Sequence, residues 1–327
     1  MAQQTAELTA AVVQYIEDEK TWDALAKRTA FMNHLMGKGK KQQKGGLYIQ
    51  FPIKLLANQA SGFISGTSAI TSTNPSIQLQ YGILNWKYYN FNINFTLADF
   101  TIASGKEQIV DFFAEKTEGG LNDAIREWST AFHGSSASAP LQPEGLQDIF
   151  AASGTAYASL TDTDYGTGAY LPILDTTASV VNYANINSKI LQLAGRTQKE
   201  LLPENQMGLM NPATYGRFQS SVQNQQIFTE ATVFKSGSPG FRVNNIDFFL
   251  DSDVPGTQDG STGDNYVYIF PMDCMKMYYH FGFGTKSPFD GEVQMPNQPI
   301  MSTQHYISFN LVDVNRRLGV AFKAFVA

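Results

Sequence analysis

The sequence predicts an α+β protein, with helical and strand periodicities in separate stretches of the chain. Apolar residues recur at helical spacing between Ser104 and Gly134, and a helix of about 28 residues would be roughly 42 Å long. Two shorter stretches, residues 47–55 and 91–97, alternate apolar and polar side chains, as half-buried strands do. The 327 residues suffice to bury a core built from both kinds of element.

The composition favours a folded protein with a largely uncharged polar surface. Only 16% of the residues are charged, against about 25% in an average chain, while 43% are hydrophobic and 13% are aromatic. Such values argue against a disordered chain. We expect the uncharged polar surface to be covered, in the simplest case by further copies of the chain.

Three features bear on the compartment. The single cysteine, Cys274, excludes an internal disulfide and fits a reducing cytoplasm. Met1 is followed by AQQTAEL, without a basic region or an apolar segment, so we expect no secretory signal. No window approaches about 18 consecutive apolar residues, so we expect no transmembrane helix.

Charge is distributed unevenly along the chain, whose net charge is −6. Residues 1–23 carry a net charge of −4, residues 24–98 contain no acidic residue and carry +8, and residues 99–327 carry −10. The basic stretch could be neutralised within the subunit or by the acidic part of a neighbouring copy. Its densest part, Lys38–Lys44, could also face nucleic acid or form a solvated loop.

The first 46 residues predict two short helices and a flexible break. Apolar residues at helical spacing lie between Leu8 and Ile16, and again between Trp22 and Met36. Thr21 is the expected N-cap of the second helix, and Gly37 is its expected end. The segment GKGKKQQKGG that follows has the composition of a flexible connection.

The two alternating stretches predict strands that flank a projecting arm. Pro52 cannot donate a ladder hydrogen bond, so its strand is expected at a sheet edge. Leu56–Asn90 is rich in Ser, Thr, Asn, Gln and Gly, and it exceeds the roughly 12–15 residues at which loops become uncommon in compact domains. A two-stranded arm needs a partner surface. A floppy loop is the alternative, but the segment carries many apolar residues: Ile64, Ile70, Ile77, Leu79, Tyr81, Ile83, Leu84 and Trp86.

The long helix has a defined start and end. Ser104 and Glu107 form an S-x-x-E capping box, and Gly134 is the expected stop. Gly119 and Gly120 lie inside the helix and cost about 1 kcal/mol each against alanine, which a bend or a close contact would explain. The apolar stripe consists of Ile109, Phe113, Leu121, Ile125, Trp128 and Phe132.

The rest of the chain predicts a mixed region. Gly134–Gly145 has the composition of a linker. Apolar spacing through Ile186, Ile190, Leu191 and Ala194 predicts a helix that ends near Gly195, and Asn211 with Pro212 predicts the start of a helix through about Val222.

Strands are expected after these two helices. Phe241–Leu250 and Tyr266–Phe270 are the first pair, separated by a 15-residue surface loop. Ile307–Leu311, a turn at Asn315 and Leu318–Val326 predict a closing hairpin that ends at Ala327 without a tail.

No catalytic, cofactor or metal motif emerges. The DTDYGTG segment, Asp162–Gly168, departs from a calcium loop because Gly166 replaces the third ligand and Ile173 the twelfth. FGFGTKS lacks the spacing of a phosphate loop. Cys274 is expected to be a small core residue. The aspartates that follow the strand Phe241–Leu250 favour turns over an ion site, namely Asp251, Asp253, Asp259 and Asp264. The histidines are far apart and show no paired metal spacing, namely His34, His133, His280 and His305.

The order of these elements resembles the tailed-bacteriophage major capsid proteins of the Hong Kong 97 type. GGLYIQFPI and FNINFTLADF resemble the two stems of that family's extended loop. SGKEQIVDFFAEKTEGGLNDAIREWSTAFHG resembles its spine helix, and PEGLQDIF resembles the segment that leaves the helix. MNPATYGRF, FFLDSDVP and GDNYVYIF resemble parts of the axial domain.

The resemblance implies a particular domain organisation. Residues 1–45 would form an N-terminal arm, and residues 46–98 an extended β-hairpin loop with its stem strands. Residues 99–140 would form a peripheral domain with the spine helix, and residues 141–300 a mixed axial domain. Residues 301–327 would form the C-terminal hairpin, returning to the peripheral domain.

The resemblance also implies a structural protein rather than an enzyme. Its role would be that of a major capsid protein that self-assembles into the icosahedral shell enclosing the phage genome. Its partners would be copies of itself in pentamers and hexamers, a separate scaffolding protein, a portal and packaged double-stranded DNA held by non-specific contacts. We expect no cofactor and no membrane. The protein would be assembled in the host cytoplasm and reside in the virion.

Residues of the basic stretch and the arm are the expected contacts between subunits. Some relatives cross-link a lysine to an asparagine, and Lys54 lies near the corresponding stem, but no partner or catalytic glutamate is identifiable, so we expect no cross-link. The alternative function is a β-rich carbohydrate-binding or adhesin-type virion protein. The expected contact residues are Lys38, Lys40, Lys41, Lys44, Lys54, Ile64, Ile70, Ile77 and Tyr81.

Overall fold

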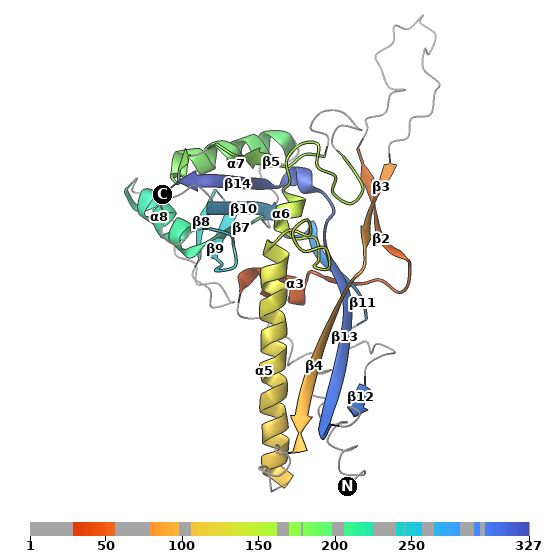
Figure 1. Ribbon diagram of the computed structural model, residues 1–327. Helices are drawn as coiled ribbons and strands as arrows, with labels where there is room; N and C mark the ends of the chain where they lie inside the picture. The colour runs from red at the N-terminus through yellow and green to blue at the C-terminus, as the bar shows by residue number, and fades with distance from the viewer. Residues whose placement is uncertain are drawn as a thin grey trace, which may run out of the picture.

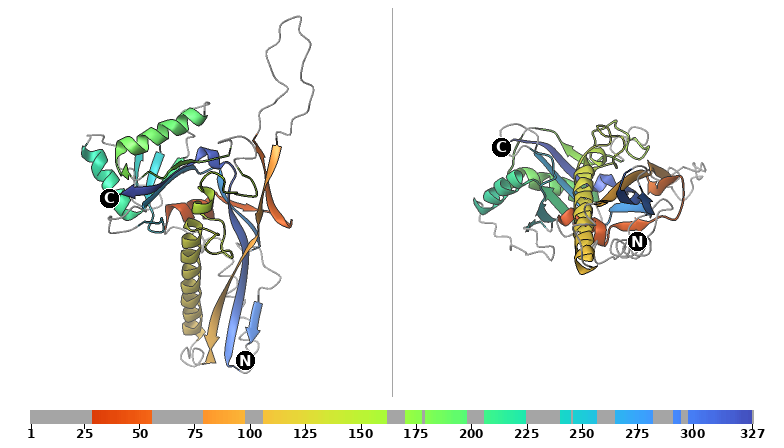
Figure 2. Two further views of the ribbon diagram at one scale, coloured as in Figure 1. Left: turned by 45° about the horizontal axis from the view of Figure 1, so that its top comes forward. Right: turned by 60° about the horizontal axis from the view of Figure 1, so that its bottom comes forward.

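Two sheets and one long helix organise the chain in a computed structural model (Figure 1). An elongated part contains helix α5 (Lys106–His133) beside strands β4 (Lys87–Thr96) and β13 (Ile300–Asp313). A broader part at one end of α5 contains the second sheet and its helices (Figure 2). The structure describes residues 29–55, 79–97, 106–161, 170–177, 179–197, 206–224, 240–244, 246–256, 265–281, 291–294 and 298–326.

A five-stranded sheet runs along α5. Its long central strand, β13, pairs antiparallel with β4 over ten residue positions, from Ile300 opposite Thr96 to Phe309 opposite Lys87. Strands β11 (Met275–Phe281) and β12 (Gly291–Gln294) also pair antiparallel with β13. Strand β1 (Lys40–Gln42) pairs parallel with β11 at the edge of the sheet.

A seven-stranded sheet forms the broader part. Its main order is β5 (Ile173–Asp175), β14 (Val320–Val326), β10 (Asn265–Pro271), β7 (Gln206–Met210), β9 (Ile246–Leu250) and β8 (Gly240–Val243). Strand β6 (Ser179–Val180) also pairs with β14. Strand β10 is buried on both faces, because alternate residues belong to two different core clusters.

The smaller core cluster lies between this sheet and helices α7 (Tyr183–Thr197) and α8 (Pro212–Asn224). Ile186 and Ile190 of α7 and Phe218 of α8 contribute to it, together with Val267 and Ile269 of β10. Asn211 caps α8 as predicted, since its Oδ1 accepts a hydrogen bond from the Thr214 amide at 2.7 Å. Helix α7 matches the predicted segment, but Leu191 is 61% exposed and Leu193 takes the core position instead.

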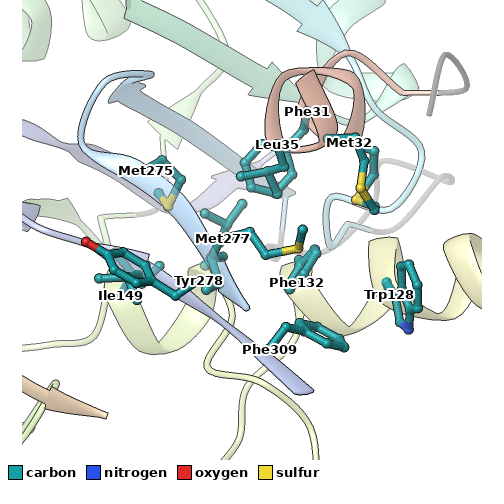
Figure 3. Close-up of a cluster of buried hydrophobic side chains, with 14 of the residues drawn as sticks. Phe31, Met32, Leu35, Trp128, Phe132, Ile149, Met275, Met277, Tyr278 and Phe309 are labelled. Carbon is teal, nitrogen blue, oxygen red and sulfur yellow. The ribbon is translucent and has the colours of Figure 1, made fainter. Parts of the chain in front are cut away.

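The larger core cluster joins the two sheets at the end of α5 (Figure 3). Trp128 and Phe132 of α5 contact Phe309 of β13 with ring centroids 5.5 and 5.7 Å apart. Helix α3 (Ala30–Gly37) inserts Phe31, whose ring lies 5.6 Å from that of Phe270 of β10. The short helix α6 (Leu146–Ile149) and the 3-10 helix η2 (Arg316–Leu318) lie at the same junction.

The base of the predicted arm is a separate two-stranded antiparallel sheet, but the prediction of its second strand is wrong: residues 91–96 belong to β4, which pairs with β13 instead of the first predicted strand. Strand β2 (Tyr48–Lys54) pairs with β3 (Leu79–Asn85), and this pairing leaves β2 an edge strand among the described residues, as Pro52 predicted. Residues 56–78 lie outside the described part of the chain, and so do the expected contacts Ile64, Ile70 and Ile77.

The strongest sequence patterns are confirmed. Helix α5 has 28 residues and ends one residue before Gly134, with Trp128 buried on the predicted stripe. Strands β2 and β4 alternate between buried and exposed residues as expected. The buried face is shorter than predicted, because Leu47 at the start of the first stretch and Leu97 at the end of the second are exposed. The predicted capping box at Ser104 and the predicted helix at Leu8–Ile16 lie outside the described residues.

The predicted closing hairpin is wrong. Strand β13 belongs to the five-stranded sheet and β14 to the seven-stranded sheet, and they are not paired with each other. Helix η2, which follows Asn315, redirects the chain from one sheet to the other. The predicted strand Phe241–Leu250 is likewise two strands, β8 and β9, because Asn244 adopts a left-handed conformation with φ of 48°.

Two segments expected to be loosely held are ordered. The GKGKKQQKGG connection contributes β1 to a sheet. In the Gly134–Gly145 segment, the Asp148 carboxylate accepts hydrogen bonds from Ser135 Oγ at 2.5 Å and from the Ser136 amide at 2.6 Å. Within the second predicted helix, the described part is α3, whose N-cap is Thr29, since Thr29 Oγ1 accepts from the Met32 amide at 3.2 Å. The expected N-cap Thr21 lies outside the described residues.

Candidate assembly surfaces

The arm stem presents an apolar outer face. Tyr48, Leu79 and Tyr81 are 41%, 56% and 58% exposed, and Tyr81 lies opposite Pro52 in the ladder. Exposed apolar residues are ordinary when single, but here they share one face of a narrow two-stranded ribbon. This face is therefore suited to contact with another protein surface.

The opposite face of the stem is buried and fixes its orientation. Ile49, Phe51 and Ile53 of β2 belong to the larger core cluster, as does Leu84 of β3. The Phe51 ring lies over Gly82, its cross-strand partner, so close that a Cβ at position 82 would stand 2.3 Å from Phe51 Cζ. A glycine at this position thus admits the aromatic ring. The stem is held rigidly by its inner face while its outer face remains accessible.

Hydrogen bonds secure the base of the stem. Trp86 Nε1 donates to the Gly46 carbonyl at 2.9 Å, and Gln43 Nε2 donates to the carbonyls of Gly45 and Tyr48 at 3.2 and 3.1 Å. On the other side of β3, the Ile83 amide donates to the Ala158 carbonyl at 2.8 Å. The two ends of the base are thus tied to each other, and β3 is tied to the segment that contains Ala158.

The lysines predicted to contact neighbours divide into two environments. Lys40 and Lys41 lie in β1, where Lys41 Nζ stands 5.2 Å from the Tyr278 ring centroid and 3.4 Å from the Tyr278 hydroxyl. Lys38 caps the end of α3, and both it and Lys44 are exposed. Lys38 thus lies at a helix end, Lys40 and Lys41 at a sheet edge, and Lys44 in the irregular segment after β1.

Lys54 and Tyr81 lie on the stem, away from that cluster. Lys54 is exposed and stands opposite Leu79 in the ladder. Because side chains alternate along a strand, Lys54 shares the outer face with Pro52, opposite Tyr81. The structure thus brings these two predicted contact residues onto one face.

The side of β4 that carries its exposed residues is polar and uncharged over much of its length. Asn90, Asn92 and Asn94 are exposed on β4, and they lie opposite Tyr306, Gln304 and Ser302 of β13. Amide and hydroxyl groups can exchange water for hydrogen bonds to another chain without the desolvation cost of charges. This surface matches the uncharged polar surface expected from the composition.

A buried polar cluster near η2 was not anticipated from the sequence. Arg316 is fully buried, with Nε donating to the Tyr170 carbonyl at 2.7 Å and Cζ 4.6 Å from the Tyr170 ring centroid. Asp313 is also fully buried; its Oδ1 accepts from the Asn315 amide at 2.9 Å, and burial raises the pKa of its carboxyl to about 6. The cluster lies where the chain passes from β13 to β14, and therefore between the two sheets.

Cys274 lacks the surroundings of a reactive thiol. Burial raises the pKa of the Cys274 thiol to about 12, so it stays protonated at neutral pH. Cys274 was expected in the core, but its exposure is intermediate and it belongs to neither buried cluster. Within the described chain, none of the helices is long and apolar enough to cross a membrane.

One group of side chains that could bind a metal ion was not predicted from the sequence. His133 at the end of α5 meets Asp251 and Asp253, which follow β9. The loop after β9 was expected on the surface, but Asp251 is only 1% exposed. Local spacing gives no signal for this group, because its members are remote in sequence. Asp259, Asp264 and the DTDYGTG segment lie outside the described residues.

Comparison with known proteins identifies the fold. Neither known protein families nor curated proteins match the chain by sequence. Among solved structures, a capsid subunit of cyanophage A-1(L) matches with a TM-score of 0.62 and 12% identity, over 90% of this chain and 92% of that one. The capsid of the native GTA particle, computed with C5 symmetry, matches with a TM-score of 0.60 and 14% identity, over 90% of both chains.

A third match lies outside the phages. The SrpI encapsulin of Synechococcus elongatus PCC 7942 gives a TM-score of 0.54 and 9% identity, over 87% of this chain and 84% of that one. The chain therefore has the α+β fold of phage capsid and encapsulin subunits, as its resemblance to the Hong Kong 97 type predicted.

Proposed function

We propose that this chain is the major capsid protein of a tailed bacteriophage, and that copies of it assemble into an icosahedral shell around the phage genome. The observation that carries the proposal is the likeness of fold to capsid subunits over nearly the whole chain. The protein would act as a structural, non-enzymatic component of the virion, assembled in the host cytoplasm.

The outer face of the arm stem supports contacts between subunits. It exposes apolar residues on a ribbon whose other face is anchored in the core. In our proposal this face, together with Lys54 and the residues 56–78 that follow it, overlaps a neighbouring subunit. Pentamers and hexamers would be built from such overlaps, with Ile64, Ile70 and Ile77 among the contact residues.

Further partners follow from the same proposal. A separate scaffolding protein and a portal would accompany assembly, and packaged double-stranded DNA would contact the inner surface without sequence preference. The cluster of Lys38, Lys40, Lys41 and Lys44 would bind acidic surfaces of neighbouring subunits. No lysine cross-link is proposed.

Electron microscopy of the full chain, expressed alone and with a candidate scaffolding protein, tests the proposal. Closed shells, pentamers or hexamers are expected. Tyr81→Ser should reduce assembly while shifting the free energy of unfolding by no more than about 0.5 kcal/mol, since Tyr81 is exposed. The matched control is Leu141→Ser, which alters an exposed apolar residue outside the stem. A stable monomer that binds glycans would favour the adhesin alternative.

A further inference from the structure

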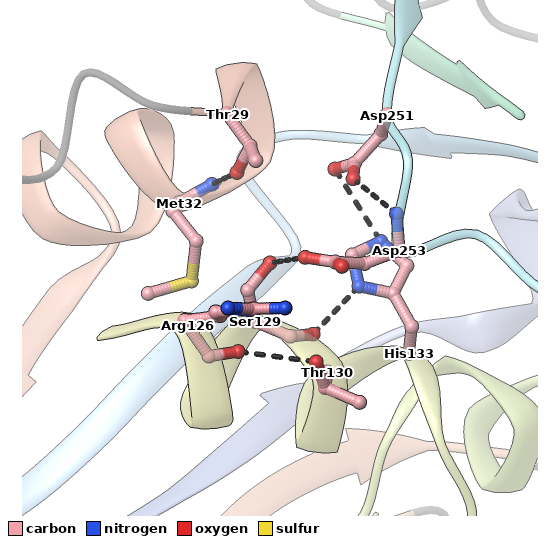
Figure 4. Close-up of polar contacts among 8 residues, drawn as sticks. All are labelled: Thr29, Met32, Arg126, Ser129, Thr130, His133, Asp251 and Asp253. Atoms are coloured by element: carbon pink, nitrogen blue, oxygen red, sulfur yellow. Dashed lines mark hydrogen bonds and ion pairs between the residues drawn. The ribbon is translucent and has the colours of Figure 1, made fainter. Parts of the chain in front are cut away.

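The last turn of α5 meets the loop after β9 through buried polar groups (Figure 4). His133 is 1% exposed, and its Nδ1 lies 2.7 Å from the carbonyl oxygen of Ser129, one turn earlier in the helix. A carbonyl oxygen can only accept, so Nδ1 carries the proton of this hydrogen bond. The Ser129 carbonyl therefore fixes the tautomer and the orientation of the imidazole.

The other ring nitrogen faces a carboxylate. His133 Nε2 lies 3.5 Å from Asp251 Oδ2, and Asp251 is also 1% exposed. Neither atom has a hydrogen-bond partner among the described residues. In neutral histidine, Nε2 presents a lone pair, so two acceptors would face each other away from water. Such an arrangement needs a cation between or beside the two atoms, either a proton or a metal ion.

Asp253 supplies a third ligand-type group at the same place. One ligand atom from each of His133, Asp251 and Asp253 lies within 4.8 Å of the others. Ser129 Oγ donates a hydrogen bond to Asp253 Oδ2, and the Asp253 amide donates to Asp251 Oδ1 at 3.0 Å. Each of the three side chains thus makes a hydrogen bond to another protein group that orients it, as is usual around metal ligands in proteins.

We propose that His133, Asp251 and Asp253 bind a zinc ion that fastens the end of α5 to the loop between β9 and β10. One imidazole nitrogen and two carboxylate oxygens match the ligands of zinc sites with three protein groups, in which water takes the fourth position. Calcium prefers about 6–8 oxygen ligands, and magnesium prefers octahedral oxygen coordination, so this nitrogen-containing set suits neither. The ion would connect the elongated part of the subunit to the seven-stranded sheet.

Zinc binding by the purified full chain tests the site. After treatment with a chelator and gel filtration, added Zn²⁺ should be retained at about one ion per chain by elemental analysis. The temperature of unfolding should rise with Zn²⁺ concentration, since a ligand that binds the folded state stabilises it. Ca²⁺ and Mg²⁺ at the same concentrations should leave it unchanged. A zinc-independent unfolding temperature without retained zinc would overturn the proposal and leave a proton, instead of a metal ion, between His133 Nε2 and Asp251 Oδ2.

Matched variants separate this site from zinc bound elsewhere. Asp253→Asn keeps an oxygen that can accept from Ser129 but removes the charge, and it should abolish retention. Asp247→Asn is the control, because it removes a carboxylate that pairs with Arg242 and is not one of the three clustered groups. Ser129→Ala keeps all three ligands and should weaken zinc affinity about 10–100-fold. If Asp253→Asn and Ser129→Ala both bound zinc as tightly as the natural protein, the ion would lie elsewhere.

Discussion

The hydroxyl of Tyr89 in β4 donates a hydrogen bond of 2.7 Å to Glu127 Oε2 in α5. The same tyrosine places its ring 5.3 Å from Trp128, at an interplanar angle of 80°. One residue thus connects the five-stranded sheet to the long helix through both polar and aromatic contacts. Burial and the neighbouring Glu127 carboxylate raise the pKa of Tyr89, so the hydroxyl remains a donor at physiological pH.

Tyr89→Phe should destabilise the subunit only modestly. It removes the hydrogen bond and keeps the ring, and a typical intramolecular hydrogen bond contributes about 0.5–1.5 kcal/mol. The bond to Glu127 is exposed to solvent, so the loss should lie at the lower end of that range. Urea unfolding measures the change. Tyr88→Phe is the control, since Tyr88 is 68% exposed. If Tyr88→Phe lowered the free energy of unfolding more than Tyr89→Phe, the stabilising role of the Tyr89–Glu127 hydrogen bond would be refuted.

Trp128→Ala should cost much more, about 3–5 kcal/mol, because a large aromatic side chain leaves a cavity when removed from a core. Trp128 is 1% exposed and contacts the rings of Tyr89 and Phe309. Denaturant unfolding of the unassembled subunit measures this change. The solvent-exposed Leu191 gives a control, Leu191→Ala, with little expected effect. If Trp128→Ala left the free energy of unfolding nearly unchanged, the packing of α5 against β13 would be contradicted.

Gly82→Ala should destabilise the arm stem in a way that depends on Phe51. An alanine Cβ would stand 2.3 Å from Phe51 Cζ, so the buried ring would have to move. The expected cost is about 1–3 kcal/mol, as for other overpacked sites. The same substitution in a Phe51→Leu background should cost less, because the shorter side chain leaves space for the methyl group. Equal costs in both backgrounds, measured by urea unfolding, would rule out the contact as the cause.

Local periodicity predicted the faces of the elements well, for physical reasons. The alternation of Phe91, Ile93 and Phe95 with asparagines reports which side of β4 is buried, and that information is present in the residues themselves. The stripe through Leu121, Ile125 and Trp128 does the same for α5. The general architecture followed from the order of these elements and from the family resemblance.

Pairing partners were less predictable, because periodicity does not name the neighbouring strand. The sequences Ile307–Leu311 and Leu318–Val326 both alternate apolar and other residues and are close together in the chain, which favoured a hairpin. The buried Arg316 between them fixes η2 against Tyr170, and the chain passes to another sheet. The aspartates after β9 suggested a solvated loop for a similar reason: the imidazole that faces Asp251 comes from a remote helix.

Asp313 should give the subunit a distinctive pH dependence. Burial raises the pKa of its carboxyl from 3.8 to about 6, so the folded state holds a proton that the unfolded state has released. The contribution of Asp313 to stability is therefore fully present below about pH 4 and falls as the pH rises through about 6. Asp313→Asn lacks this titration but can still accept from the Asn315 amide. The free energy of unfolding of the variant, relative to that of the natural protein, should increase between about pH 4 and 6. A difference that does not change with pH would exclude the raised pKa of Asp313.

The lysine cluster should influence assembly more than folding. Replacing Lys38, Lys40, Lys41 and Lys44 with glutamine removes the contact of Lys41 with the Tyr278 ring, worth about 0.5–1 kcal/mol at an exposed site. Lys41→Gln alone is the control for that loss. If the cluster binds acidic surfaces of neighbours, the quadruple variant should assemble less well than the control. Light scattering and electron microscopy measure this difference.

Salt distinguishes contacts between subunits from contacts with DNA. Surface charges are screened beyond about 8 Å at 0.15 M salt, so a neighbour-binding cluster makes assembly of the natural protein sensitive to salt. Each pair contributes only about 0–1 kcal/mol, but a closed shell repeats the contact in every subunit. The quadruple variant should therefore assemble weakly at low salt and respond less to added salt than the natural protein. Normal shells with reduced DNA content would instead assign the cluster to the packaged genome, and normal shells with normal DNA content would leave it a solvated edge.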